Sequence, residues 1–265
     1  MKDLEIENYM FDEKSLYIAF TIIYNDLLTY DKNLKAPIED IQSFIDKLQN
    51  VRNVFVSLKN LKDMLDNKLL KNFDVSATKS LKKQLDFVDF IRNKSIAHLD
   101  LDLLTRASQW SPQIFIANHE KDLKLITLEC YKASIEASIN AYIAMHKQDT
   151  FKNEIDLHYP PDGEQFFNFL QTAIQKSISW LEIRLKFLAR MFSPLSEKEQ
   201  LRLYYIAGST NFNLKESIYV GKEITANSID EMEKKHYAII NEHNLMTPES
   251  EKVYKELYAR WKKIL

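Results

Sequence analysis

The chain has little of the residue types that crosslink a small fold or turn its backbone sharply. Its 265 residues include one cysteine, three glycines and six prolines. A single cysteine, Cys130, excludes an intrachain disulfide, and its apolar helical surroundings predict a buried, inert thiol. So few glycines leave little material for the tight turns of β-hairpins. Together with a 45% hydrophobic content, which argues against disorder, this composition predicts an all-α fold.

The sequence also lacks long apolar segments and an excess of one charge. Its longest apolar run, residues 16–23, is about half as long as a bilayer-spanning helix requires, and residues 1–5 are too polar for a signal peptide. The formal net charge is −2, so there is no overall basic field of the kind that many nucleic-acid-binding proteins carry. We therefore expect a cytoplasmic protein with no membrane partner. Any contact with a nucleic acid must come from a local patch or from a groove between subunits.

Apolar residues recur at helical spacing along most of the chain. The pattern predicts helices over residues 16–30, 37–65, 76–92, 123–145 and 167–192, with Pro37 in the first turn of the second. Ser196, Ser228 and Thr247 each begin a helix-capping pattern with an acidic residue close behind.

The strongest turn signal is the sequence Tyr159-Pro160-Pro161-Asp162-Gly163. We place a domain boundary there. The prediction is a helical bundle over residues 1–148, a linker over 149–163, and a helical region of unknown role over 164–265.

One short segment carries a chemical pattern. Arg92, Asn93 and His98 lie within seven residues, at the end of the third predicted helix. Arginine binds phosphate through a fixed fork of donors, and histidine transfers protons near neutral pH. On an ideal helix the arginine and the histidine would lie about 120° apart and about 9 Å apart along the axis. We therefore predict that the helix bends or ends between them, or that a second protomer completes the site.

The arginine and the histidine, separated by five residues, resemble the motif of the HEPN superfamily. The segment 92–100 is similar to HEPN proteins of the abortive-infection type, and the resemblance covers residues 16–145. It implies an antiparallel helical bundle with a C-terminal helical extension, a homodimer that faces two motifs across a cleft, and RNA as the substrate. It also implies a toxin or defence setting with a cognate antitoxin protein as partner.

The resemblance further implies a metal-independent endoribonuclease with no cofactor. His98 would transfer the proton, Arg92 would hold the scissile phosphate, and Asn93 would orient the phosphate or the imidazole. Lys94 and Asp100 are auxiliary candidates. Some toxin members carry a tyrosine, modified by a partner enzyme, where this chain has Asp100, so the resemblance does not extend to that modification.

A different class of function remains open, namely a non-catalytic helical interaction or ligand-binding module. In that case Arg92 would pair with Asp86, Asp89 or Asp100, and His98 would cap a helix end. Two further pairs have metal-ligand spacing, Glu154 with His158 and Glu233 with His236. Neither pair has further ligands in the sequence, and we expect no metal site.

Overall fold

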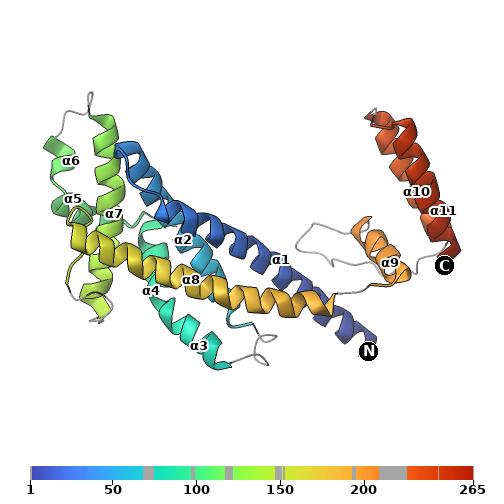
Figure 1. Ribbon diagram of the computed structural model, residues 1–265, viewed down its shortest axis with the longest axis horizontal. Coiled ribbons are helices and arrows are strands. Elements are labelled where there is room, and N and C mark those ends of the chain that lie inside the picture. The colour runs from blue at the N-terminus through green and yellow to red at the C-terminus, as the bar shows by residue number, and fades with distance from the viewer. Residues whose placement is uncertain are drawn as a thin grey trace. The chain divides into compact units, whose positions relative to one another are not determined.

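A computed structural model describes residues 2–67, 75–96, 99–116, 122–146, 151, 153–192, 195–208, 226–243 and 245–264. Within these ranges every regular element is a helix, which confirms the predicted all-α fold class (Figure 1). The helices form two compact units, Met1–Met191 and Phe192–Leu265. None of the described helices is both long and apolar enough to cross a membrane.

Four long helices build the first unit: α1 (Lys2–Lys35), α2 (Ile41–Met64), α7 (Leu123–His146) and α8 (Pro160–Met191). Helix α1 packs against both α2 and α8, and α2 packs against α7. Figure 1 shows α1 and α8 running antiparallel. The apolar stripes that the sequence predicts for α1, α2 and α8 form the core of this unit. Their fully buried members include Phe20, Leu27, Leu48, Val51, Phe55, Leu58, Leu61, Leu170, Ile174 and Leu181.

Shorter helices connect α2 to α7. They are α3 (Val75–Gln84), α4 (Asp86–Ile91), the π-helix η2 (Arg92–Ile96), α5 (Leu101–Trp110) and α6 (Gln113–Ile116). Helix α5 packs along α7, while α4 and η2 contact both α2 and α7. The third predicted helix is therefore present, but it is divided into α3 and α4 and ends in a π-turn.

Phe87 of α4 is the centre of an aromatic cluster. Its ring meets those of Phe55, Tyr142, Phe151 and Phe169 edge-on, with centroids 4.9 to 5.8 Å apart. Such pairs add about 0.5–1.5 kcal/mol each beyond the burial of their area. The cluster holds α4 against α2, α7 and α8, and so fixes the backbone from which Arg92 starts.

The start of α2 differs from the prediction. The N-cap is Asp40, whose Oδ1 accepts a hydrogen bond from the Ser43 backbone N–H at 2.7 Å, while Ser43 Oγ accepts from the Asp40 backbone N–H at 2.9 Å. This reciprocal capping satisfies two backbone donors and fixes the start of α2 at Ile41. Pro37 therefore precedes the helix.

The structure places the division between units at Met191 and Phe192, so the predicted boundary at 149–163 is wrong. Within that predicted linker Ile155 and Leu157 are buried, at 1% and 6% exposure. Pro160 and Pro161 form the first turn of α8, a position that proline tolerates because its missing N–H has no helical partner there. The proline pair thus marks a helix start inside the first unit.

The second unit contains α9 (Glu197–Gly208), α10 (Ala226–Glu242) and α11 (Pro248–Ile264). Its core is a small cluster of four buried side chains, Leu201, Ile229, Tyr258 and Trp261. The predicted caps at Ser196 and Thr247 are confirmed by hydrogen bonds to Glu199 and Ser250. The predicted cap at Ser228 is wrong, because α10 already begins at Ala226.

Candidate functional site

The segment that carries the Arg92 motif leaves α4 as a π-turn. Arg92 is the C-cap of α4, and its backbone N–H donates to the carbonyls of Val88 and Asp89. Residues Arg92–Ile96 then form η2, and α5 begins only at Leu101. Single π-turns are rare and occur frequently at functional sites, because the wider turn changes the direction of the side chains that follow. The helix therefore ends between Arg92 and position 98. The angular offset between Arg92 and His98 on an ideal helix requires either such a bend or end, or a second protomer. His98 itself lies outside the described residues.

The Arg92 side chain is half-buried, and its Nη1 donates to Asn93 Oδ1 at 3.1 Å. Within the described part of the chain it forms no ion pair. Two carboxylates proposed as its partners, Asp86 and Asp89, instead contact Lys62, and Asp89 also lies 3.2 Å from Lys59 Nζ. The Arg92 guanidinium thus retains donors for an external anion, and Asn93 beside it is exposed.

The two auxiliary candidates, Lys94 and Asp100, pair with each other. Lys94 Nζ lies 2.6 Å from Asp100 Oδ2, and the Asp100 backbone N–H donates to the Lys94 carbonyl at 3.2 Å. Asp100 is also the N-cap of α5, accepting from the Leu103 N–H at 3.1 Å. The hydrogen bonds from Lys94 and from this N–H lower the pKa of Asp100. The pair clamps the backbone on both sides of position 98.

A second guanidinium reaches this segment from α2. Arg52 Nη2 lies 3.5 Å from the Ile96 carbonyl oxygen, and its guanidinium carbon lies 5.6 Å from the centroid of the Tyr131 ring. Arg52 lines a cavity of about 210 Å³ together with Leu99 and Tyr131. Sequence reasoning missed Arg52, since no local pattern links it to a segment forty-four residues away.

Cys130 lines the same cavity and is exposed, so the prediction of a buried thiol is wrong. Helix α7 is apolar around much of its circumference, and its apolar pattern therefore does not distinguish the solvent-facing positions. Partial loss of solvent around the sulfur and the nearby Glu129 carboxylate raise the pKa of Cys130. The sulfur therefore stays a thiol near neutral pH, which makes it a poor nucleophile.

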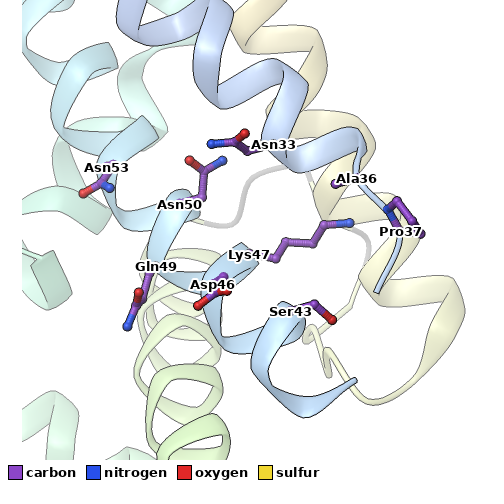
Figure 2. A pocket seen from close by; sticks show the side chains of 9 residues that line it. All are labelled: Asn33, Ala36, Pro37, Ser43, Asp46, Lys47, Gln49, Asn50 and Asn53. Atoms are coloured by element: carbon purple, nitrogen blue, oxygen red, sulfur yellow. The ribbon is translucent and has the colours of Figure 1, made fainter. Parts of the chain in front are cut away.

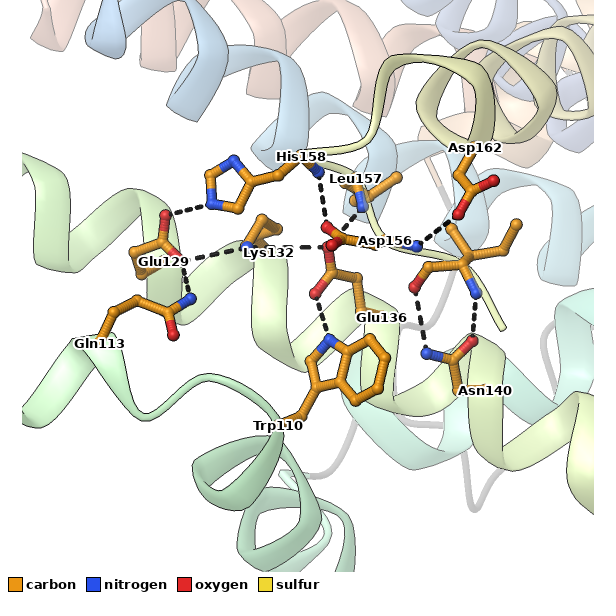
Figure 3. Close-up of polar contacts among 11 residues, drawn as sticks. Trp110, Gln113, Glu129, Lys132, Glu136, Asn140, Asp156, Leu157, His158 and Asp162 are labelled. Carbon is orange, nitrogen blue, oxygen red and sulfur yellow. Dashed lines mark hydrogen bonds and ion pairs between the residues drawn. The ribbon is translucent and has the colours of Figure 1, made fainter. Parts of the chain in front are cut away.

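A buried polar network lies on another face of α7 (Figure 3). Glu136 is fully buried, its Oε1 accepts from the Leu157 backbone N–H at 2.6 Å, and its Oε2 accepts from Trp110 Nε1 at 2.8 Å. Burial raises the pKa of Glu136. Lys132 Nζ lies 3.9 Å from the same carboxylate and 3.2 Å from Glu129.

Glu129 continues this network toward the surface. Its Oε1 lies 2.7 Å from His158 Nε2, and its Oε2 accepts from Gln113 at 2.7 Å. Burial raises the pKa of Glu129, but the hydrogen bonds from Gln113 and Lys132 outweigh it and lower the pKa overall. Because partners come from α5, from α6 and from residues 153–159, the network holds these three segments on α7. Its role is therefore structural, and three charged residues on one helical face are the only sign of it in the sequence.

The other sequence candidates are engaged separately. His158 contacts Glu129 and not Glu154, while His236 Nδ1 lies 2.7 Å from Tyr258 Oη and Glu233 lies 2.7 Å from Lys262. No group of three or more metal-ligating side chains occurs in the ranges that the structure describes.

A polar pocket of about 420 Å³ lies where α1 ends and α2 begins (Figure 2). Lys47 crosses it, half-buried, with its ammonium 5.4 Å from the centroid of the Phe167 ring. Burial lowers the pKa of Lys47. The side-chain amide of Asn50 already donates a hydrogen bond to the Tyr30 carbonyl at 3.1 Å. The pocket contains no member of the Arg92 motif.

Comparisons of the chain with family models, with curated proteins and with solved structures returned no match.

Proposed function

We propose that the protein is a HEPN-like RNA-binding protein and a metal-independent endoribonuclease, with Arg92 and His98 as its catalytic pair. The observation that carries the proposal is the π-turn Arg92–Ile96. A straight α-helix would keep the arginine and the histidine apart, whereas the end of the helix in this turn removes that obstacle.

The charge around Arg92 also supports the proposal. Lysines hold Asp86 and Asp89, and Asp100 is bound to Lys94, so none of these carboxylates competes with phosphate for Arg92. Arg52 adds a second guanidinium beside Ile96. Two guanidinium groups close to one backbone segment give a local anion-binding site in a chain whose net charge is −2.

The proposed reaction is an internal transesterification of RNA. His98 accepts the proton of a ribose 2′-hydroxyl, the 2′-oxygen attacks the adjacent phosphorus, and the bond to the 5′-oxygen breaks. The departing 5′-oxygen takes a proton from an imidazolium, which the His98 of a second protomer supplies in a homodimer. Arg92 stabilises the charge that develops on the phosphorus oxygens, and Asn93 keeps Arg92 oriented through the hydrogen bond between them. The products are a 2′,3′-cyclic phosphate and a 5′-hydroxyl.

This activity is typical of a toxin or defence protein whose ribonuclease activity is inhibited by a cognate antitoxin protein. The test is cleavage of RNA in the presence of EDTA by wild type, Arg92→Ala and His98→Ala. The control is Arg190→Ala, which removes an exposed arginine of α8 far along the sequence from the motif. We expect both motif variants to lose about 10²-fold or more in rate, and the control to cleave like wild type.

Three outcomes separate the competing functions. Equal cleavage by all four proteins would mean that a contaminant cuts the RNA, and it would overturn the proposal. RNA binding that Arg92→Ala weakens, without any cleavage by wild type, would leave only a binding role. Unchanged RNA binding together with a lower melting temperature in both motif variants would favour the non-catalytic interaction module.

A further inference from the structure

A pocket of about 520 Å³ lies between α5, α7 and residues 153–159, and we call it the α5–α7 pocket. Its size is within the range of small-molecule sites. It contains no residue of the Arg92 motif. The residues that matter for its chemistry are Arg106, Gln109, Trp110, Ala141, Met145 and Glu154.

Part-buried hydrogen bonds fix the side chains and backbone that line the α5–α7 pocket. Trp110 donates its indole N–H to the fully buried Glu136, which sets the position of the ring (Figure 3). Asn140 accepts from the Ile155 N–H at 2.7 Å and donates to the Ile155 carbonyl at 3.1 Å. The two hydrogen bonds between Asn140 and Ile155 hold in place the segment that carries Glu154. A pocket whose walls are already ordered loses less entropy when a ligand binds.

The free polar groups of the pocket are a cation, a neutral amide and an anion. Arg106 and Gln109 are both exposed and come from α5, and Glu154 is exposed and comes from the segment 153–159. Within the described residues none of these three side chains has a hydrogen-bond or ion-pair partner. The lining also includes Trp110 and an apolar group, which consists of Ala137, Ala141, Ala144 and Met145.

We propose that the α5–α7 pocket binds a free amino acid with a large apolar side chain. The α-carboxylate pairs with the Arg106 guanidinium and accepts from Gln109, and the α-ammonium pairs with Glu154. The apolar side chain lies on Trp110 and the apolar group, where burial of its surface contributes affinity. A residue within a peptide lacks at least one of the two charges, so this arrangement selects the free zwitterion.

The test is calorimetric titration of the full-length protein with L-phenylalanine, L-tryptophan and L-leucine. Two analogues of phenylalanine each lack one charge: 3-phenylpropionate has no ammonium and phenethylamine has no carboxylate. Glycine lacks the side chain. We expect saturable binding of at least one of the three amino acids, and a loss of about tenfold or more in affinity for each missing group.

The variants assign each contact to its side chain. Arg106→Ala and Glu154→Gln should each weaken the amino acid about tenfold. Arg106→Ala should leave phenethylamine unaffected, and Glu154→Gln should leave 3-phenylpropionate unaffected. Both residues are exposed and unpaired in the described structure, so the variants keep the fold, which melting temperatures check. Arg190→Ala and Glu164→Gln, exposed positions on α8, are the matched controls.

Two results would overturn the proposal. The first is the absence of saturable binding by all three amino acids up to millimolar concentrations. The second is binding that neither Arg106→Ala nor Glu154→Gln weakens, because the ligand would then occupy another place. Neither result bears on cleavage of RNA by the Arg92 motif, so the two proposals fail independently.

Discussion

Four buried charged residues of the first unit, one on α2 and three on α7, have charged partners. Lys62 on α2 contacts Asp86 and Asp89, while Glu129 and Lys132 on α7 contact each other. Removing one partner of such a pair leaves the other charge poorly solvated, which costs more than the pair itself contributes. These residues are therefore expected to influence stability and not ligand binding.

Lys62→Met should lower the free energy of unfolding by about 1–2 kcal/mol, a figure reduced from that of a fully buried pair because Asp89 is partly exposed. Burial raises the pKa of Asp89 and lowers that of Lys62, but the pairing outweighs it in both cases, so the pKa of Asp89 is lowered and that of Lys62 is raised. The stabilisation is therefore fully present between the ordinary pKa values of about 3.9 and 10.4, and it is lost as the pH falls through the lowered pKa of Asp89. Urea unfolding at pH 7 and at acid pH measures both effects.

The control for this prediction is Lys82→Met. Lys82 pairs with Asp66 at 2.5 Å, but both side chains are exposed, so its loss should cost less than about 1 kcal/mol. Equal destabilisation by the two variants would contradict the role assigned to burial.

Sequence reasoning could nominate Arg92 and His98 because their meaning is local: two residue types at a short spacing. It could not find Arg52, Glu136 or Trp110, whose roles arise from contacts between residues far apart in the chain. The sequence also could not show that the alternative partners proposed for Arg92 are bound to other residues, for the same reason. Only the fold reveals that Lys62 lies beside Asp86 and Asp89.

At the start of α5, Asp100 combines two functions that substitution can separate. Asp100→Asn keeps a side-chain oxygen for the cap but loses the charge that attracts Lys94, whereas Asp100→Ala loses both. We expect melting temperatures in the order wild type, then Asn, then Ala. Since the pKa of Asp100 is lowered in the fold, the advantage of wild type over Asp100→Asn should vanish as the pH falls through that pKa.

Hydrogen exchange locates this effect. In Asp100→Ala the amides of residues 101–103 should exchange faster, because the first turn of α5 loses its cap. If the Ala variant melted and exchanged like wild type, the clamp around position 98 would not exist in solution.

The segment 153–159 depends on Asn140 in a similar way. Asn140→Ala removes both hydrogen bonds to Ile155 and leaves a buried backbone N–H and carbonyl without partners, at a cost of about 1–3 kcal/mol. Exchange of the amides in 153–159 should accelerate, and the affinity for the proposed amino acid should fall as Glu154 loses its anchor. Asn168→Ala, at an exposed position of α8, is the control and should change neither.

The helices themselves were largely predictable, because each long one buries an apolar stripe that the spacing of its residues reveals. The clearest cases are Phe20 and Leu27 on α1 and Leu170 on α8. The predicted domain boundary at 149–163 was wrong because it rested on Pro160 and Pro161, and a proline pair is typical both of a turn and of the start of a helix. The choice between them depends on the burial of Ile155 and Leu157, which is a tertiary effect.

The extent of the first unit gives a prediction for the whole molecule. Helix α8 buries Phe166, Leu170, Ile174 and Leu181, and it packs against α1. A fragment of residues 1–191 keeps this packing, and we expect it to be monodisperse or dimeric and to unfold cooperatively. A fragment of residues 1–148 lacks α8 and the segment 153–159, so it exposes the apolar face of α1 and leaves Glu136 without its Leu157 partner. We expect it to aggregate or to lose cooperative unfolding. Size-exclusion chromatography and thermal unfolding of both fragments distinguish the two domain boundaries. A stable 1–148 fragment that unfolds cooperatively would support the domain boundary at 149–163 instead.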